Sequence, residues 1–197
     1  EFKKKQKLEI FDSLFLDRLN KLIETTTESF ENYEYSNAKK DIEKFFWNDF
    51  CDNYLEVVKK RIYENKIGKE SAQYTLYQTL FALIKLFSPI IPYITEELYQ
   101  RYFKENEKEL SVHLALWPTK FETEKIKGGE DKLELFFEVL SKIRQEKSNN
   151  KKSMRSKIML TIEKESLSKL KDLIDDLADV TNAKEIKEGK FKIDFLD

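Results

Sequence analysis

The chain has 197 residues, of which 36 are lysine or arginine and 37 are aspartate or glutamate, so its net charge is −1. Because the charges balance, composition gives no global electrostatic argument for a nucleic-acid partner, and any basic surface must be local. A single cysteine excludes an internal disulfide and a cysteine-based zinc site. We therefore expect a reducing, cytoplasmic location.

The chain begins without methionine, and residues 1–5 are too polar for the apolar segment of a secretion signal. We interpret the sequence as a piece of a longer protein. Residues 76–94 form the most apolar stretch, but Lys85 and two prolines interrupt it. This stretch predicts a buried helix and no membrane contact.

Apolar residues at steps of three and four predict long helices over residues 14–30, 38–63 and 71–87. Gly68 is suited to the left-handed conformation of a helix end, and Ser71 is suited to an N-cap. We take the helix over residues 38–63 as the central element. The expected core residues are Phe46, Phe50, Tyr54, Phe81 and Phe87.

The second half of the bundle is predicted from similar signals. A shorter helix opens at Thr95, an extended segment covers residues 111–118, and another helix follows the Gly128–Gly129 break. Helices joined by short loops favour an antiparallel bundle. The sequence thus predicts a mainly α chain, with an antiparallel helix bundle over residues 1–147.

The composition changes after Lys147, where a polar linker precedes a segment of strand composition at residues 157–162. A helix follows, and two segments flanking Gly189 resemble a β-hairpin. We therefore predict a second unit, a small α/β subdomain over residues 148–197.

Candidate catalytic groups are few. The only cysteine–histidine pair is Cys51 with His113, and Cys51 lies among aromatic residues, which favours a buried inert thiol. No glycine cluster forms a phosphate-binding loop. Asp49, Asp52 and Glu56 share a helix face, which we interpret as a solvated or internally bonded stripe. We predict no catalytic residue and no metal site.

Basic residues cluster where the central helix ends. In an antiparallel bundle this end lies beside the start of the first helix, so we expect Arg18 nearby. A cationic bundle end with Tyr63 suits an RNA loop, because phosphates bind the charges and unstacked bases lie on flat side chains. A solvated helix end is the alternative. The candidate RNA-binding residues are Arg18, Lys59, Lys60, Arg61, Lys66 and Lys69. A second basic run, interpreted as a linker and a second phosphate contact, contains Lys147, Lys151, Lys152, Arg155 and Lys157.

The segment Phe46–Glu56 resembles the phenylalanine-cysteine-aspartate-x-tyrosine-x-glutamate helix of class I aminoacyl-tRNA synthetases for branched aliphatic amino acids, most closely the valyl-tRNA synthetases. Further segments agree in order: residues 18–20 with 33–38, 86–99 and 111–118. The resemblance covers residues 12–147. Asn53 departs from the tryptophan of this pattern, so isoleucyl- and leucyl-tRNA synthetases remain alternatives.

The resemblance implies a helical anticodon-binding domain that binds and positions the tRNA anticodon loop. The family's His-x-Gly-His and Lys-Met-Ser-Lys-Ser catalytic motifs are not in the sequence, so we expect a noncatalytic piece that needs no cofactor. The parent ligase would join valine to tRNA with ATP and Mg²⁺ during protein biosynthesis. The expected partners are valine tRNA and an upstream catalytic domain. A free-standing helical RNA-binding module, and an enzyme using the carboxylates of the central helix, are the other readings.

Overall fold

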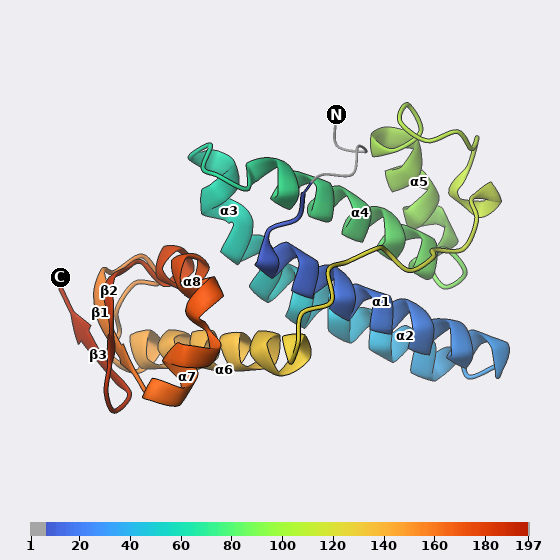
Figure 1. Cartoon of the computed structure of the whole chain (residues 1–197). Coiled ribbons are helices and arrows are strands. Elements are labelled where there is room, and N and C mark those ends of the chain that lie inside the picture. The colour runs from blue at the N-terminus through green and yellow to red at the C-terminus, as the bar shows by residue number, and fades with distance from the viewer. Residues whose placement is uncertain (1–6, 197) are drawn as a thin grey trace.

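Three long helical segments form the main bundle of the computed structural model, which describes residues 7–196 (Figure 1). The first is α1 (Ile10–Glu31) and the third is α4 (Lys69–Phe87). The second is continuous and comprises α2 (Tyr35–Lys44), the π-helical segment η1 (Phe45–Tyr54) and α3 (Leu55–Tyr63). All three predicted helices are thus confirmed.

The π-helical segment η1 was not predicted, because apolar steps of four and five resemble an ordinary amphipathic helix over a short stretch. It places Phe45, Phe50 and Tyr54 on the buried side of the segment. The Tyr54 ring stacks on Phe15 of α1 at a centroid distance of 4.0 Å. This aromatic stack joins the central segment to α1.

The predicted core is confirmed in part. Phe50 and Tyr54 are buried, whereas Phe46, Phe81 and Phe87 are only half-buried. The fully buried aromatic residues at the centre are instead Phe11 and Phe15 of α1 and Phe136 of α6 (Gly129–Asn149).

The start of α4 differs from the expectation. Gly68 takes the predicted left-handed conformation, with φ of 83°, and directly precedes the helix. A Cβ atom at this position would lie 2.6 Å from Cγ of Glu9, so the Glu9 side chain packs directly against the glycine backbone. Ser71 is inside the helix, where its hydroxyl accepts from the Glu9 amide at 2.8 Å and donates to Asp12. The N-cap prediction for Ser71 is therefore wrong.

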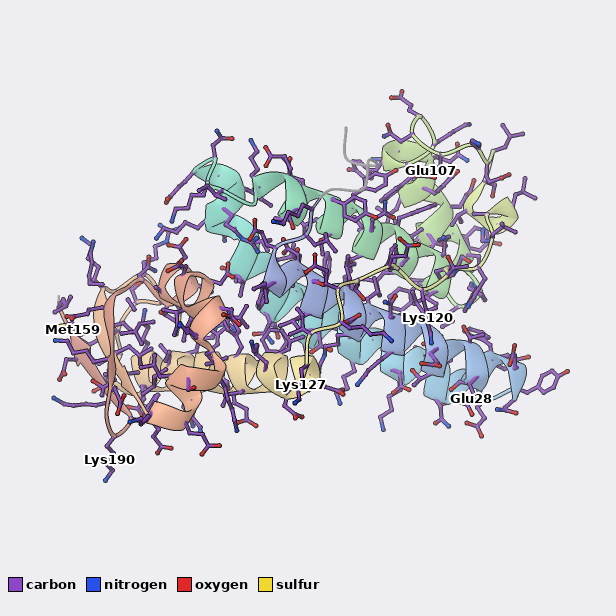
Figure 2. All side chains as sticks on the ribbon, viewed as in Figure 1. Glu28, Glu107, Lys120, Lys127, Met159 and Lys190 are labelled. Atoms are coloured by element: carbon purple, nitrogen blue, oxygen red, sulfur yellow. The ribbon has the colours of Figure 1, made fainter. Side chains whose placement is uncertain are left out.

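The chain then crosses the bundle. Helix α5 (Pro92–Tyr102) starts at Pro92, earlier than predicted, since proline lacks the amide that a first turn leaves unpaired. The predicted extended segment contains one 3₁₀ turn (Val112–Leu114) and then runs along α1 to α6 (Gly129–Asn149) (Figure 1). Figure 2 labels Lys120 where this segment passes α1, and its ammonium lies 2.9 Å from Glu24.

The C-terminal unit is a small sheet covered by helices. Strand β1 (Ile158–Ile162) is central, parallel to β2 (Ala183–Glu188) and antiparallel to β3 (Lys192–Phe195). The crossover from β1 to β2 contains α7 (Lys164–Lys169), a 3₁₀ turn (Lys171–Leu173) and α8 (Ile174–Thr181). The fold class, a helix bundle with a small α/β unit, is confirmed.

The predicted hairpin around Gly189 is wrong, because the strand order is β2-β1-β3 and the two flanking strands each pair with β1. Every second residue of β1 is buried, whereas β2 and β3 contain no buried residue. The most buried strand therefore takes the central position of the sheet. Leu160 faces Ile186 on β2 and Ile193 on β3.

One continuous apolar cluster includes residues of the bundle and of the C-terminal unit, among them Phe136 of α6 and Leu177 of α8. The domain boundary after residue 147 stays a prediction. No helix within residues 7–196 is both long enough and apolar enough to cross a membrane.

Candidate nucleic-acid interface

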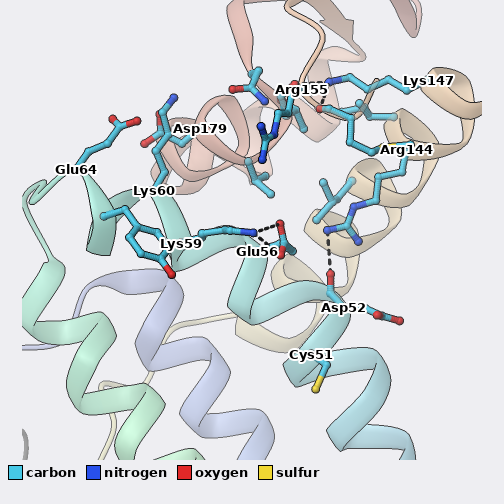
Figure 3. Close-up of a pocket in the computed structure, with 17 residues that line it drawn as sticks. Cys51, Asp52, Glu56, Lys59, Lys60, Glu64, Arg144, Lys147, Arg155 and Asp179 are labelled. Atoms are coloured by element: carbon cyan, nitrogen blue, oxygen red, sulfur yellow. Dashed lines mark hydrogen bonds and ion pairs between the residues drawn. The ribbon is translucent and has the colours of Figure 1, made fainter. Parts of the chain in front are cut away.

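A groove of about 830 Å³ lies between α3, α6 and the C-terminal unit (Figure 3). Cationic side chains reach it from each wall: Lys59 and Lys60 from α3, Arg144 from α6 and Arg155 from the linker. It is the place where members of both predicted basic runs meet.

Arg61 is not part of this exposed surface. Its side chain lies inside the protein and is only 6% exposed, and it donates to both oxygens of Asp12 at 3.0 and 3.1 Å. Asp12 is fully buried, and it also accepts from the Tyr54 hydroxyl at 2.7 Å. Nε of Arg61 lies 3.4 Å from Asp176 of α8. Because these partners hold the guanidinium inside the protein, Arg61 is removed from the RNA-binding candidates.

The carboxyl of Asp176 has an unusual environment. Burial raises the pKa of Asp176 to about 6, although the positive charge of Arg61 acts in the opposite direction. Negative charges on Asp12 and Asp179 add to the upward shift. Arg61 therefore joins α3 to α1 through Asp12 and to α8 through Asp176, and Asp176 has a pKa of about 6.

Arg18 lies away from the bundle end, contrary to the expectation. It is 3.1 Å from Asp49 of η1 and also binds Glu134 of α6. The antiparallel arrangement does bring the start of α1 close to Arg61, where Asp12 binds it. Arg18 lies six residues beyond Asp12 in the sequence, or about 9 Å further along the helix. The pair with Asp49 also shows that this carboxylate is internally bonded.

The four lysines of the first basic run do lie at this end of the bundle. Lys60 and Lys66 both bind Asp179 of α8, at 3.0 and 2.6 Å. Lys59 is 3.1 Å from Glu56, and Lys69 donates to Asn65 at 2.9 Å. The ammonium groups are therefore at the surface with exchangeable partners, so they stay candidates.

Lys147 of the second run is buried, with 1% of its surface exposed. Its ammonium donates to the carbonyls of Met154, Ser156 and Thr181 at 2.9, 2.9 and 2.7 Å. These three bonds use all three donors, so Lys147 is removed from the phosphate-binding candidates.

The rest of the second run is nearer to solvent. Lys151 and Arg155 are exposed, and Lys152 is half-buried with its ammonium 5.8 Å from the Phe195 ring centre. Arg155 also lines the groove. These three residues stay candidates.

Sequence reasoning missed Arg144. Its guanidinium donates to the carbonyl of Asp52 at 2.9 Å (Figure 3) and to Oδ1 of Asn53 at 3.0 Å. Burial lowers the pKa of Arg144. A search for uninterrupted basic runs could not find it, because Glu146 separates Arg144 from the second run. Helical spacing could have indicated it, because Arg144 lies four residues after the buried Leu140 and so on the same face of α6.

Within residues 7–196, no group of three or more histidine, cysteine, aspartate or glutamate side chains could hold a metal ion. Burial raises the pKa of the half-buried Cys51 thiol, which keeps it in the less reactive protonated form.

Comparison with known families identifies the class of protein. The family described as the anticodon-binding domain of tRNA ligase matches residues 12–179. This chain belongs to that family, as its sequence motifs predicted. The match includes the bundle and continues into the C-terminal unit.

The names of individual relatives are more specific than the family description. The chain is 37% identical over 198 residues to the valine–tRNA ligase of Rickettsia rickettsii (strain Sheila Smith), covering 94% of this chain and 23% of the relative. It is 38% identical over 185 residues to the valine–tRNA ligase of Wolbachia pipientis wMel, covering 91% of this chain and 21% of that relative. The chain thus spans about a quarter of the length of these relatives.

Proposed function

We propose that this chain is the part of a valine–tRNA ligase that binds and positions the anticodon loop of valine tRNA. The supporting observation is the family match over residues 12–179, together with relatives that are named valine–tRNA ligases. Those names favour valine over isoleucine or leucine, which the sequence motifs left open.

The proposed contact surface is the end of the bundle where α3 meets α4. Lys59, Lys60, Lys66 and Lys69 lie there, and each is held by a side-chain partner that a phosphate could replace. Lys151, Lys152 and Arg155 extend the surface onto the linker. A phosphate contact places the RNA without reading its sequence, so identity must be checked by other side chains.

In the full ligase, ATP and Mg²⁺ would be used by the catalytic domain, and the reaction would take place in the cytoplasm. The part described here would hold one end of the tRNA so that the other end reaches that domain. Its contribution to catalysis is therefore orientation.

The test compares Lys60→Glu with Lys39→Glu, a matched reversal at an exposed lysine of α2 outside the groove lining. Binding is measured with a valine-tRNA anticodon stem-loop, and with a stem-loop whose central anticodon base is changed, over a salt series. We expect the wild-type chain to prefer the valine loop. Lys60→Glu should weaken both loops about equally, by about 10-fold, whereas Lys39→Glu should have little effect.

Two results would contradict this function. One is a wild-type chain that binds no stem-loop at low salt. The other is equal binding of the valine loop and of an unrelated hairpin, which would leave only nonspecific attraction between charges.

A further inference from the structure

We infer that the groove between α3, α6 and the C-terminal unit holds one unstacked nucleotide of the RNA loop, with its phosphate on Arg144 and Arg155. This inference rests on the proposed function and deepens it. It adds Arg144 as a phosphate ligand, places Arg155 opposite to it on the same phosphate, and gives the C-terminal unit a direct role in RNA binding.

The first argument is the charge balance of the groove. Lys59 is paired with Glu56, and Lys60 is paired with Asp179. Arg144 instead bonds only neutral acceptors, an amide oxygen and a backbone carbonyl. Among residues 7–196, neither Arg144 nor Arg155 forms an ion pair with a carboxylate. Asp52 and Glu56 line the same groove and act on Arg144 at longer range, but they do not occupy its donors. Arg144 and Arg155 can therefore each form a direct, charge-assisted hydrogen bond with an anionic ligand.

The second argument is the geometry of Arg144. Two hydrogen bonds, at 3.0 and 2.9 Å, fix the plane of its guanidinium, and an arginine has five donors in total. Three donors remain, and Arg144 lines the groove, so two adjacent donors of the planar guanidinium can act as a rigid fork toward a ligand. Such a fork matches two oxygens of a phosphate, and its fixed orientation lowers the entropic cost of binding.

The third argument concerns Arg155, which reaches the groove from the linker between α6 and β1, whereas Arg144 reaches it from α6 (Figure 3). The buried ammonium of Lys147 bonds the carbonyls of Met154 and Ser156, the residues on either side of Arg155. Lys147 is thus a positioning residue, because it fixes the backbone from which Arg155 projects.

The fourth argument is space for a base. Tyr63 lines the groove and its side chain is 82% exposed, so its ring offers a flat surface for stacking. A volume of about 830 Å³ lies within the range of about 300–1,000 Å³ that is usual for small-ligand sites. Phosphate ligands and a stacking surface together describe a nucleotide site.

The test measures binding of the valine anticodon stem-loop over a salt series for Arg155→Gln, Arg144→Gln, Arg144→Lys and Tyr63→Ala. The control is Arg101→Gln, an exposed arginine of α5 outside the groove lining. We expect each glutamine variant to weaken binding about 5- to 10-fold and to lower the salt slope by about one. Arg144→Lys should keep the slope and lose affinity, because it keeps the charge and loses the fork. Tyr63→Ala should lose about 10-fold with an unchanged slope, and the control should bind like wild type.

Because the Arg155 side chain is exposed, Arg155→Gln should not affect folding. Thermal unfolding of each variant shows whether the other substitutions leave the fold intact. If Arg155→Gln and Arg144→Gln bind like wild type while Lys60→Glu weakens binding, the inference is wrong and the proposed function stands. If the wild-type chain binds no stem-loop, both are wrong.

Discussion

The two basic runs of this chain each contain one buried cation, and the two buried charges are balanced in different ways. Arg61 is balanced by carboxylates, those of Asp12 and Asp176. The Lys147 ammonium is held by hydrogen bonds to three backbone carbonyls. Both cations link the bundle to the C-terminal unit, and the Arg61 link includes Asp176, whose pKa is about 6. The comparison shows that a buried cation can join two parts of a protein through carboxylates, which titrate, or through backbone carbonyls, which do not.

The largest expected effect is that of Arg61→Met. The substitution leaves Asp12 buried and charged without its cation, so we expect a loss of about 3–5 kcal/mol in the free energy of unfolding. Urea unfolding followed by circular dichroism measures it. Adding Asp12→Asn should recover part of the loss. A loss below about 1 kcal/mol, comparable to that of the exposed Arg101→Met, would show that the network contributes little.

Lys147→Met should have a smaller effect, about 2–3 kcal/mol, because it leaves three carbonyls of the protein interior without this donor. The loss should change little between pH 5 and pH 7.5, because backbone carbonyls do not titrate. Hydrogen exchange should show the greatest loss of protection in β1 and α8. A uniform loss over the whole chain would instead mean that Lys147 supports the common core.

The smallest expected effect is the pH dependence due to Asp176. Because its pKa is raised to about 6 in the folded chain, the folded state binds a proton more tightly than the unfolded state. The resulting stabilisation is complete below the ordinary aspartate pKa, where it is about 3 kcal/mol, and it is lost as the pH rises through about 6. About 2 kcal/mol of it is lost between pH 4.5 and pH 7.5. Asp176→Asn should therefore show a weaker decline in stability than wild type between pH 4.5 and pH 7.5. Equal declines in urea unfolding would contradict this assignment.

The helices were predictable because a bundle buries one face of each helix, and that face repeats in the sequence. The strand order was not predictable, since adjacent strands around Gly189 suggest a hairpin on local grounds alone. Their separation by β1 depends on burial of Ile158, Leu160 and Ile162 against distant helices.

The candidate site was predictable only as a region. Clustering of lysines identified the correct end of the bundle, but it could not show that Arg61 and Lys147 are buried. Burial of a cation depends on acceptors from segments far away in the chain, such as Asp12 for Arg61 and Thr181 for Lys147. Arg144 was missed because a single arginine outside a basic run gives no signal in the sequence. Only the fold shows that its side chain lines the groove.

The bonds of Lys147 also bear on the covalent continuity of the chain. Lys147 lies in the last turn of α6, just before the exposed linker. Its acceptors Met154 and Thr181 come after the linker in the sequence. If the backbone were broken between residues 150 and 153, the ammonium would still hold both sides, and the apolar cluster shared by α6 and α8 would still be closed. We therefore expect noncovalent contacts to keep the two parts together after a cut in this linker, once the chain has folded.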